Sequence, residues 1–317
     1  LRDQVRFLLD VLVPEPTRGW LVTAPSNSPE NFPAFPGNGE FFDETTGLVL
    51  TARTMAAGPT MDMQIIREVL TLFGDAARVL GVDSALVTEA LVARGRLAPN
   101  QVGKHGQVQE WLEDWDEIEP QHRHLSHLWG LYPGREITPE TTPALARAAA
   151  VSLDRRGTGG CGWSYAWKMG VRARLYDGNA AHDQFRALLG RSSIPNLFSL
   201  CGRALQVDGN LGGSAAIAEM LLQSHGEELR LLPALPTEWA EGTVSGLRAR
   251  GGLTLDLAWR AARVTEARLV ATRAGEVVVH APGVERVSAA GRAVRVRRVG
   301  PATLAFQASP GVTYLLQ

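Results

Sequence analysis

Hydrophobic residues along the chain follow two different periods. From Leu1 to about Leu232, apolar positions recur three or four residues apart, as on one face of an α-helix. The stretch "TMDMQIIREVLTLFGDAARVLG" puts Met63, Ile66 and Phe73 on one stripe and stops at Gly81. Loops rich in Gly, Pro and Asn join such stretches, and no fixed short repeat is present. This part is predicted to form paired helices wrapped into a barrel or solenoid.

Beyond "LLPALP", at residues 231–236, the period changes to two. In "GLTLDLAWR" the residues Leu253, Leu255, Leu257 and Trp259 fall on one face, with polar residues between them. Further short runs of this kind, divided by Gly and Pro, predict an antiparallel β-sandwich. We therefore expect a helical domain over residues 1–232 and a small all-β domain over residues 233–317.

Two helix boundaries inside the first region can be predicted from capping residues. "PETTPALARAAAVSLDRRG" has Thr138 as a predicted N-cap ahead of a proline, and it ends at Gly157. "GGSAAIAEMLLQSH" has Ser214 as its predicted N-cap.

Composition narrows the class of protein. The chain has 45% hydrophobic residues, 21% charged residues and a formal net charge of -1, which describes a globular protein with a sizeable core. This charge gives no global attraction to nucleic acid or to an anionic membrane, and no apolar run is long enough for membrane insertion. Cys161 and Cys201 fit neither a disulfide framework nor a metal motif, and they leave the redox compartment open. The chain lacks an initiating Met, so we expect a missing N-terminal part, and localisation stays open.

Unusual polar residues gather in four loop segments. Glu30 is a lone acid in "TAPSNSPEN", a stretch otherwise made of turn-forming residues. The other three segments are "EWLEDWDEIEPQHRHLSHLWGLYPG" (110–134), "GTGGCGWSYAW" (157–167) and "QVDGNLGG" (206–213).

The histidines of the second segment allow three interpretations. His122, His124 and His127 have spacings that can bind zinc, but no carboxylate or thiolate stands at a supporting distance, and no metal is expected. They can also be core groups, most readily His127. The third interpretation, favoured by the neighbouring Arg123 and several Trp, is that they hydrogen-bond a polar ligand.

Other motifs in these segments have simpler explanations. The glycine run from Gly157 to Gly162 fits GxGxxG but follows a helical pattern, so a tight turn between helices is favoured over a nucleotide site. "DGN" at Asp208 is a common turn, but its context weakens that interpretation, because Gly209, Gly212 and Gly213 let the backbone approach something closely before a helix begins. The acidic run from Glu110 to Glu119 is interpreted as a solvated helix face.

Isolated loop carboxylates together with tryptophans suggest one chemistry. Glycoside hydrolysis needs an acid to protonate the leaving oxygen and a second carboxylate for the other face of the ring. Five of the eight tryptophans lie between the Glu30 and Asp208 loops, and aromatic faces can pack on a sugar ring. Trp163 and Trp167 are four residues apart, so we expect at least one of them in the core.

Several long stretches resemble glycoside hydrolase family 95, which consists mainly of α-L-fucosidases that cleave α-1,2-linked fucose with inversion. The stretches are "VTAPSNSPENF", "EWLEDWDEIEPQHRHLSHLWGLYPG", "GGCGWSYAWKMGVRARLYDGNAAH", "LQVDGNLGGSAAIAEMLLQSH" and "LRLLPALPTEWAEGTVSGLRARGG". The resemblance implies a multidomain α plus all-β protein. Its expected parts here are an incomplete (α/α)6 barrel, a helical toroid, followed by a small antiparallel β-sandwich.

The resemblance also implies roles for residues. Glu30 matches the general acid, Asp208 serves the base side, and Arg123 and His124 contact the sugar. The remaining expected sugar contacts are Asn27, Trp163 and Asn210. The partner implied is a fucosylated oligosaccharide or glycan, and no cofactor is expected.

A mechanism follows from those roles. Glu30 is expected to be buried near Trp, with a raised pKa, and to donate its proton while Asp208 polarises a water. Inversion requires the two carboxyl groups to lie about 6.5–9.5 Å apart. The family's His-x-Asn-x-Asn segment, which positions the water, is absent, so little activity is expected of the 317-residue chain alone. Two alternatives stay open: another (α/α)6-barrel glycosidase or phosphorylase, and a non-catalytic carbohydrate-binding remnant.

Overall fold

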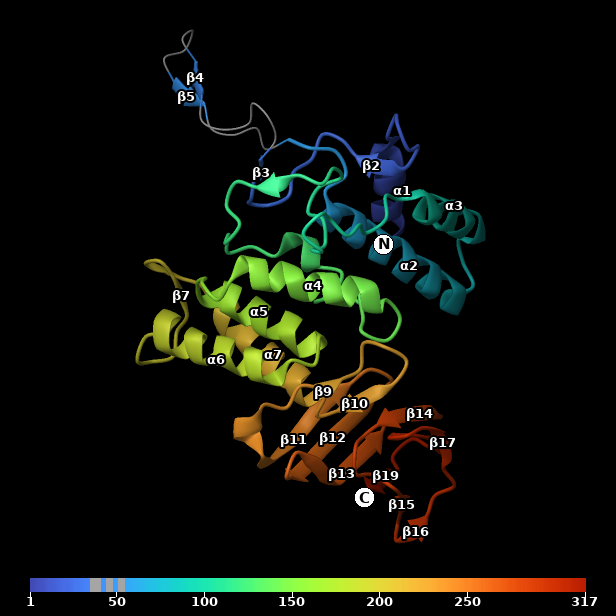
Figure 1. Cartoon of the computed structure of the whole chain (residues 1–317). Helices are drawn as coiled ribbons and strands as arrows, with labels where there is room; N and C mark the ends of the chain where they lie inside the picture. The colour runs from blue at the N-terminus through green and yellow to red at the C-terminus, as the bar shows by residue number, and fades with distance from the viewer. Residues whose placement is uncertain (35–40, 44–47, 51–54) are drawn as a thin grey trace. The chain divides into compact units, whose positions relative to one another are not determined.

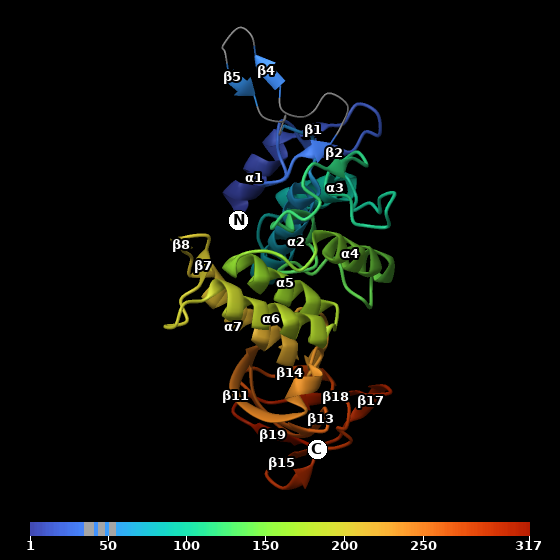
Figure 2. The ribbon, with the colours of Figure 1, turned by 60° about the vertical axis from the view of Figure 1, so that its left-hand side comes forward.

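The computed structural model describes the chain except for residues 35–40, 44–47 and 51–54. The chain divides into two compact units, Leu1–Gly160 (unit 1) and Cys161–Gln317 (unit 2). Figure 1 labels their elements, and Figure 2 shows them from a second direction. Among the described residues, no helix is both long and apolar enough to cross a membrane.

Unit 1 combines helices with short strands and long loops. Its helices are α1 (Arg2–Val11), α2 (Thr60–Leu80), α3 (Ser84–Arg96) and α4 (Pro143–Arg156), with a 3-10 turn, η1 (Ser126–Leu128). Its strands are β1 (Leu12–Pro14), β2 (Leu21–Thr23), β3 (Pro33–Ala34), β4 (Phe41–Asp43), β5 (Leu48–Leu50) and β6 (Asp116–Glu117). They pair in three antiparallel ribbons, β1 with β2, β3 with β6 and β4 with β5.

The core of unit 1 gathers on the apolar stripe of α2. Met63, Ile66 and Phe73 of this helix are buried with residues of α1, α3 and β2. The helix ends at Gly81, which caps it with φ 67°, a left-handed conformation that glycine adopts without steric cost. The predicted stripe and end of α2 are therefore confirmed.

The start of α4 differs from the prediction. The helix begins at Pro143 with Thr142 as its N-cap, not at the proline after Thr138. The hydroxyl of Thr138 accepts a hydrogen bond from the backbone N–H of Thr141 at 3.0 Å, so Thr138 closes a turn ahead of the helix. The predicted end at Gly157 is confirmed.

Unit 2 begins with three packed helices. They are α5 (Gly162–Arg174), α6 (Gly178–Ser192) and α7 (Asp208–Leu221), and they lie side by side in both views (Figures 1 and 2). A small hairpin, β7 (Leu200–Cys201) and β8 (Ala204–Leu205), stands between α6 and α7. Met169, Ala216 and Met220 are fully buried in the core that the helices share.

Two sheets complete unit 2 around one hydrophobic core. The five-stranded sheet has the order β17-β18-β14-β10-β9, and the six-stranded sheet has the order β11-β12-β13-β19-β15-β16. Their bounds are β9 (Leu222–Gln223), β10 (Leu229–Leu231), β11 (Glu241–Ala249), β12 (Leu253–Arg260), β13 (Arg263–Ala271), β14 (Gly275–His280), β15 (Val287–Ala289), β16 (Arg292–Ala293), β17 (Arg297–Gly300), β18 (Thr303–Ala308) and β19 (Thr313–Leu316), with a 3-10 turn, η2 (Thr237–Trp239).

The strand pattern expected from the sequence is present in β12. Every second residue from Leu253 to Trp259 is buried, as alternation on a half-buried strand requires. The pairs are antiparallel except β10 with β14, which run parallel. An antiparallel C-terminal β domain is thus confirmed, while the (α/α)6 barrel and the boundary at residue 232 stay predictions.

Candidate functional site

Glu30 lies on the loop between β2 and β3, where it meets a segment 93 residues further along the chain. Its Oε2 atom is 2.6 Å from Nη2 of Arg123 and 3.2 Å from Nε2 of His124. The structure therefore brings together three of the predicted site residues. The expected burial of Glu30 is wrong, because its side chain is 59% exposed and faces a guanidinium. Asn27 of the same loop is also exposed.

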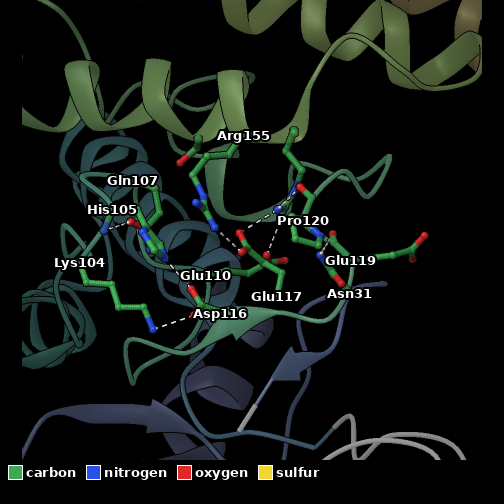
Figure 3. Close-up of polar contacts among 12 residues, drawn as sticks. Asn31, Lys104, His105, Gln107, Glu110, Asp116, Glu117, Glu119, Pro120 and Arg155 are labelled. Carbon is green, nitrogen blue, oxygen red and sulfur yellow. Dashed lines mark hydrogen bonds and ion pairs between the residues drawn. The ribbon is translucent and has the colours of Figure 1, made fainter.

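The Glu30 loop is fastened at both ends by side-chain hydrogen bonds. The hydroxyls of Thr23 and Ser26 each donate to Oδ2 of Asp62 at 2.6 Å. At the other end, Nδ2 of Asn31 donates to the carbonyl of Glu119 at 3.0 Å (Figure 3). These side chains hold both ends of a loop that lies mostly outside regular secondary structure.

The acidic run is not a solvated helix face, which corrects the sequence interpretation. Residues 110–120 form bends and the short strand β6, and both Glu110 and Glu117 are buried. Arg156, at the end of α4, donates to Oε2 of Glu110 and, at 2.8 Å, to Oε1 of Glu117. Arg155 donates to the other oxygen of Glu117 at 3.1 Å, and Figure 3 shows both carboxylates beside Arg155. Hydrophobic periodicity could not reveal these ion pairs, since their partners lie about 40 residues away.

Burial and charge shift the two carboxyl groups in opposite directions. Burial raises the pKa of Glu110, although Arg156 and the hydroxyl of Ser28 partly oppose this. Burial acts in the same sense on Glu117, but Arg156 and several hydrogen bonds outweigh it and lower the pKa of that carboxyl.

The three histidines have distinct surroundings. Burial, and next the charges of His124 and Arg123, lower the pKa of His122 to about 4. Burial also lowers the pKa of His124, against the opposing effect of Glu30. His127 is fully buried, so its pKa is lowered well below the ordinary value, and its Nδ1 lies 3.6 Å from Oε2 of Glu110 without a hydrogen bond.

His127 is thus a core residue, and its Nδ1 has no hydrogen-bond partner among the described residues. In the part of the chain that the structure describes, no cluster of three or more His, Cys, Asp or Glu side chains can hold a metal ion.

Asp208 opens α7 in unit 2. Its side chain is exposed in the first helical turn, where a negative charge interacts favourably with the helix dipole. The predicted N-cap Ser214 is wrong: the helix starts six residues earlier, and the Ser214 hydroxyl donates to the carbonyl of Asn210 at 3.0 Å. Exposed apolar residues flank Asp208, namely Leu205, Val207 and Leu211.

Asn210 uses both ends of its amide to hold the preceding loop. Its Oδ1 accepts from the backbone N–H of Ser199 at 2.9 Å, and its Nδ2 donates to the carbonyl of Leu197 at 2.7 Å. A sugar bound by this amide would have to compete with the loop. The sequence assigned Asn210 to sugar binding and gave no sign of this local role.

The loop before Asp208 is also held by a covalent cross-link. Cys161, the residue before α5, forms a disulfide with Cys201 of β7. The sequence analysis found no disulfide framework in these two cysteines, yet the structure pairs them with each other. The turn interpretation of the glycine run is confirmed, because α4 ends at Arg156 and α5 begins at Gly162. Trp163, on the first turn of α5, is partly buried, and its ring centroid is 6.3 Å from that of Trp167.

Small residues let α7 come close to its neighbours, whereas the sequence left open what the backbone approaches here. A Cβ atom on Gly209 would lie 2.8 Å from Cβ of Ser199 and 2.9 Å from the carbonyl carbon of Gly162. Cβ atoms on Gly212 and Gly213 would meet Ala166 and Leu188. The backbone of α7 therefore approaches other protein segments at all three positions.

Comparison with known proteins assigns the chain to a family. Residues 1–221 match the family model described as the glycosyl hydrolase family 95 catalytic domain, and residues 223–316 match that of the glycoside hydrolase family 95 C-terminal domain. These two matches account for nearly the whole chain. The chain therefore belongs to glycoside hydrolase family 95.

Curated relatives agree with this family. The chain is 38% identical over 272 residues to alpha-L-fucosidase 2 of Arabidopsis thaliana. The aligned region covers 82% of this chain and 31% of that protein. It is 28% identical over 289 residues to the probable alpha-fucosidase A of Aspergillus niger, covering 84% of this chain and 34% of the relative. The corresponding protein of Aspergillus oryzae is 31% identical over 231 residues, covering 64% and 32%. The chain thus spans about a third of the length of these relatives.

Proposed function

We propose that the protein is an inverting glycoside hydrolase that releases α-1,2-linked L-fucose from glycans. The observation that carries this proposal is the contact of Glu30 with Arg123 and His124, in a chain that belongs to family 95. In this proposal Glu30 is the general acid and Asp208 acts on the water side. Arg123 and His124 bind sugar hydroxyls, assisted by Asn27, Trp163 and Asn210.

The contacts of Glu30 suggest how the proton donor and the bound sugar use the same two partners, Arg123 and His124. Oε2 takes the contacts with Arg123 and His124, which leaves Oε1 for the glycosidic oxygen. Sugar hydroxyls that bind Arg123 and His124 would release the carboxyl group to act as donor. An inverting enzyme then needs a base-side carboxylate to direct water at the opposite face of the ring.

The proposal is tested by Glu30→Gln in the natural protein at its full length. We expect turnover of an α-1,2-fucosyl oligosaccharide to fall roughly 10²–10⁴-fold, the usual contribution of a general acid. An aryl fucoside with a good leaving group should lose far less. Glu89→Gln, on the exposed face of α3, is the matched control. Undiminished release from the poor leaving group would exclude Glu30 as the acid.

Product stereochemistry tests inversion separately. The sugar released first should be β-L-fucose, as seen by proton NMR before mutarotation. For the 317-residue chain alone we infer low turnover, because the sequence holds no His-x-Asn-x-Asn segment. Rapid fucose release by this chain would contradict that inference.

A non-catalytic carbohydrate-binding role is the second candidate. The exposed, ion-paired state of Glu30 favours it, since this carboxylate is arranged to accept hydrogen bonds. Calorimetry with fucosylated glycans beside a turnover assay distinguishes the two roles. Binding of glycans without turnover by the full-length natural protein would support the second.

A further inference from the structure

Four charged side chains, three of them buried and Arg155 partly buried, form a cluster in unit 1 between the Glu30 loop and the segment that carries Arg123. They are Glu110, Glu117, Arg155 and Arg156. Their formal charges cancel in pairs. The side chains of Arg156 and Glu110 are only 1% and 3% exposed. No residue of this cluster was assigned a role from the sequence.

Glu110 connects the cluster to the Glu30 loop. Its Oε1 accepts a hydrogen bond from the hydroxyl of Ser28 at 2.7 Å, two residues before Glu30. Its backbone carbonyl accepts from the N–H of Thr60 at 3.0 Å, which ties Glu110 to the first residue of α2. One side of the cluster is thereby fixed to a helix and to the loop of the proposed acid.

Arg156 connects the cluster to the partners of Glu30. Its Nε donates to the carbonyl of His124 at 3.1 Å, and its Nη1 donates to the carbonyl of Pro120 at 3.1 Å. The same guanidinium also binds Glu110 and Glu117. Only a planar group with five N–H donors can serve four acceptors in fixed directions, and lysine cannot.

We propose that Glu110 and Arg156 are positioning residues that set Glu30 in register with Arg123 and His124. A general contribution to stability explains the cluster less well, because apolar side chains often replace buried ion pairs without loss of stability. Directional contacts from one guanidinium to the segment 120–124 and, through Glu110, to the Glu30 loop explain why charged groups occupy this core. The inference rests on the proposed function only in making Glu30 the reacting group.

The decisive variant is Arg156→Lys, which keeps the positive charge and removes the planar guanidinium with its five N–H donors. Arg67→Lys is the matched control. Arg67 is also a mostly buried arginine, which donates to Oε1 of Glu136 and to the carbonyl of Ala98, each at 2.6 Å. Neither of its partners lies on the Glu30 loop or on the segment 120–124.

Titration of His122 and His124, followed by NMR without any ligand, reports the geometry of the segment. The charged groups that act on these rings are Glu30, Glu119, Arg123 and Arg156, and the two rings stack with centroids 5.0 Å apart. Burial is the largest cause of both lowered pKa values, so loosening the segment should raise them. In Arg156→Lys we expect the pKa of His122 to rise from about 4 by about one unit.

Two outcomes would overturn the proposal: unchanged titrations in Arg156→Lys, or equal shifts in Arg67→Lys. If Arg156→Lys does not fold, Ser28→Ala is titrated in its place against Ser152→Ala. Both serines are buried, and the hydroxyl of Ser152 accepts from the N–H of Val108 at 3.0 Å. Only Ser28→Ala should change the pKa of His124. An unchanged pKa of His124 in that variant would equally overturn the proposal.

Turnover provides a separate measurement on the full-length protein. Arg156→Lys should lower kcat at least about tenfold with KM changed less than about twofold, because misplaced groups lose transition-state contacts. If the unmodified protein releases no fucose, the proposed function fails while the titrations still decide the positioning role. A normal kcat in Arg156→Lys would overturn the positioning role in an active enzyme.

Discussion

The two proposed catalytic carboxylates, one in each compact unit, are supported by different kinds of interaction. The loop of Glu30 in unit 1 is tied down by side-chain hydrogen bonds and by a buried charge cluster. The loop before Asp208 in unit 2 is tied down by a disulfide, by the amide of Asn210 and by close packing at Gly209.

This difference predicts which perturbations should affect each carboxylate. Charge and protonation control the first support, so substitutions of ionised groups and changes of pH should act there. Covalent linkage and side-chain volume control the second, so reduction and an added methyl group should act there.

Loss of the disulfide should have the largest effect. Cys161 and Cys201 are 40 residues apart, and a cross-link of that span stabilises a fold by about 2–4 kcal/mol. Cys161→Ser with Cys201→Ser should lower the unfolding free energy of unit 2 by this amount. Hydrogen exchange should show protection lost first in residues 193–206, while the Glu30 loop keeps its protection.

The sequence offers a matched control for this prediction. The 317-residue chain has two cysteines, and both are in the disulfide, so dithiothreitol should destabilise this chain and leave its double serine variant unchanged. Equal unfolding free energies for the oxidised and reduced protein would contradict a supporting role for the disulfide.

The sequence predicts some of these elements because their signals are local. Alternation over residues 253–259 needs only a period of two, and Gly81 alone is enough to end α2. The acidic run was misinterpreted because distant partners decide its role: Arg156 pairs with Glu110 and Glu117. Ser214 was misinterpreted because α7 already starts at Asp208, so Ser214 lies inside the helix and its hydroxyl donates to the carbonyl of Asn210. Glu30, Arg123 and His124 were identified through family motifs, whereas pairing of two cysteines 40 residues apart has no local signal.

An added methyl group at Gly209 should have the next largest effect. Its Cβ would overlap Ser199 and the backbone of Gly162, and overpacking of this kind costs about 1–3 kcal/mol. Gly209→Ala should therefore lower the unfolding free energy of unit 2, measured by urea denaturation. Gly190→Ala in α6, where a Cβ meets nothing within 4 Å, should raise it by about 0.4–1 kcal/mol. Equal effects at the two glycines would show that close packing does not support α7.

Low pH should act mainly on the interactions that hold the Glu30 loop. Its effect through a single group should be smaller than the effects of the two substitutions above. The pKa of His122 is about 4 in the folded protein and 6.5 ordinarily. Between these values the unfolded chain binds a proton that the folded chain does not, so stability falls as pH falls from 6.5 to 4. We expect a stability loss of about 1–2 kcal/mol from this group over that pH range.

The variant His122→Gln separates this effect from opposing ones in the same unit. The raised pKa of Glu110 acts in the other direction, because the folded state then binds a proton more readily than the unfolded state as pH falls. Urea unfolding at pH 7 and pH 4.5 should therefore show a smaller stability loss in His122→Gln than in the natural protein. His105→Gln, at an exposed histidine paired with Asp116, should leave the loss within about 0.5 kcal/mol. If both variants keep the full loss, the acid sensitivity of unit 1 arises from groups other than His122.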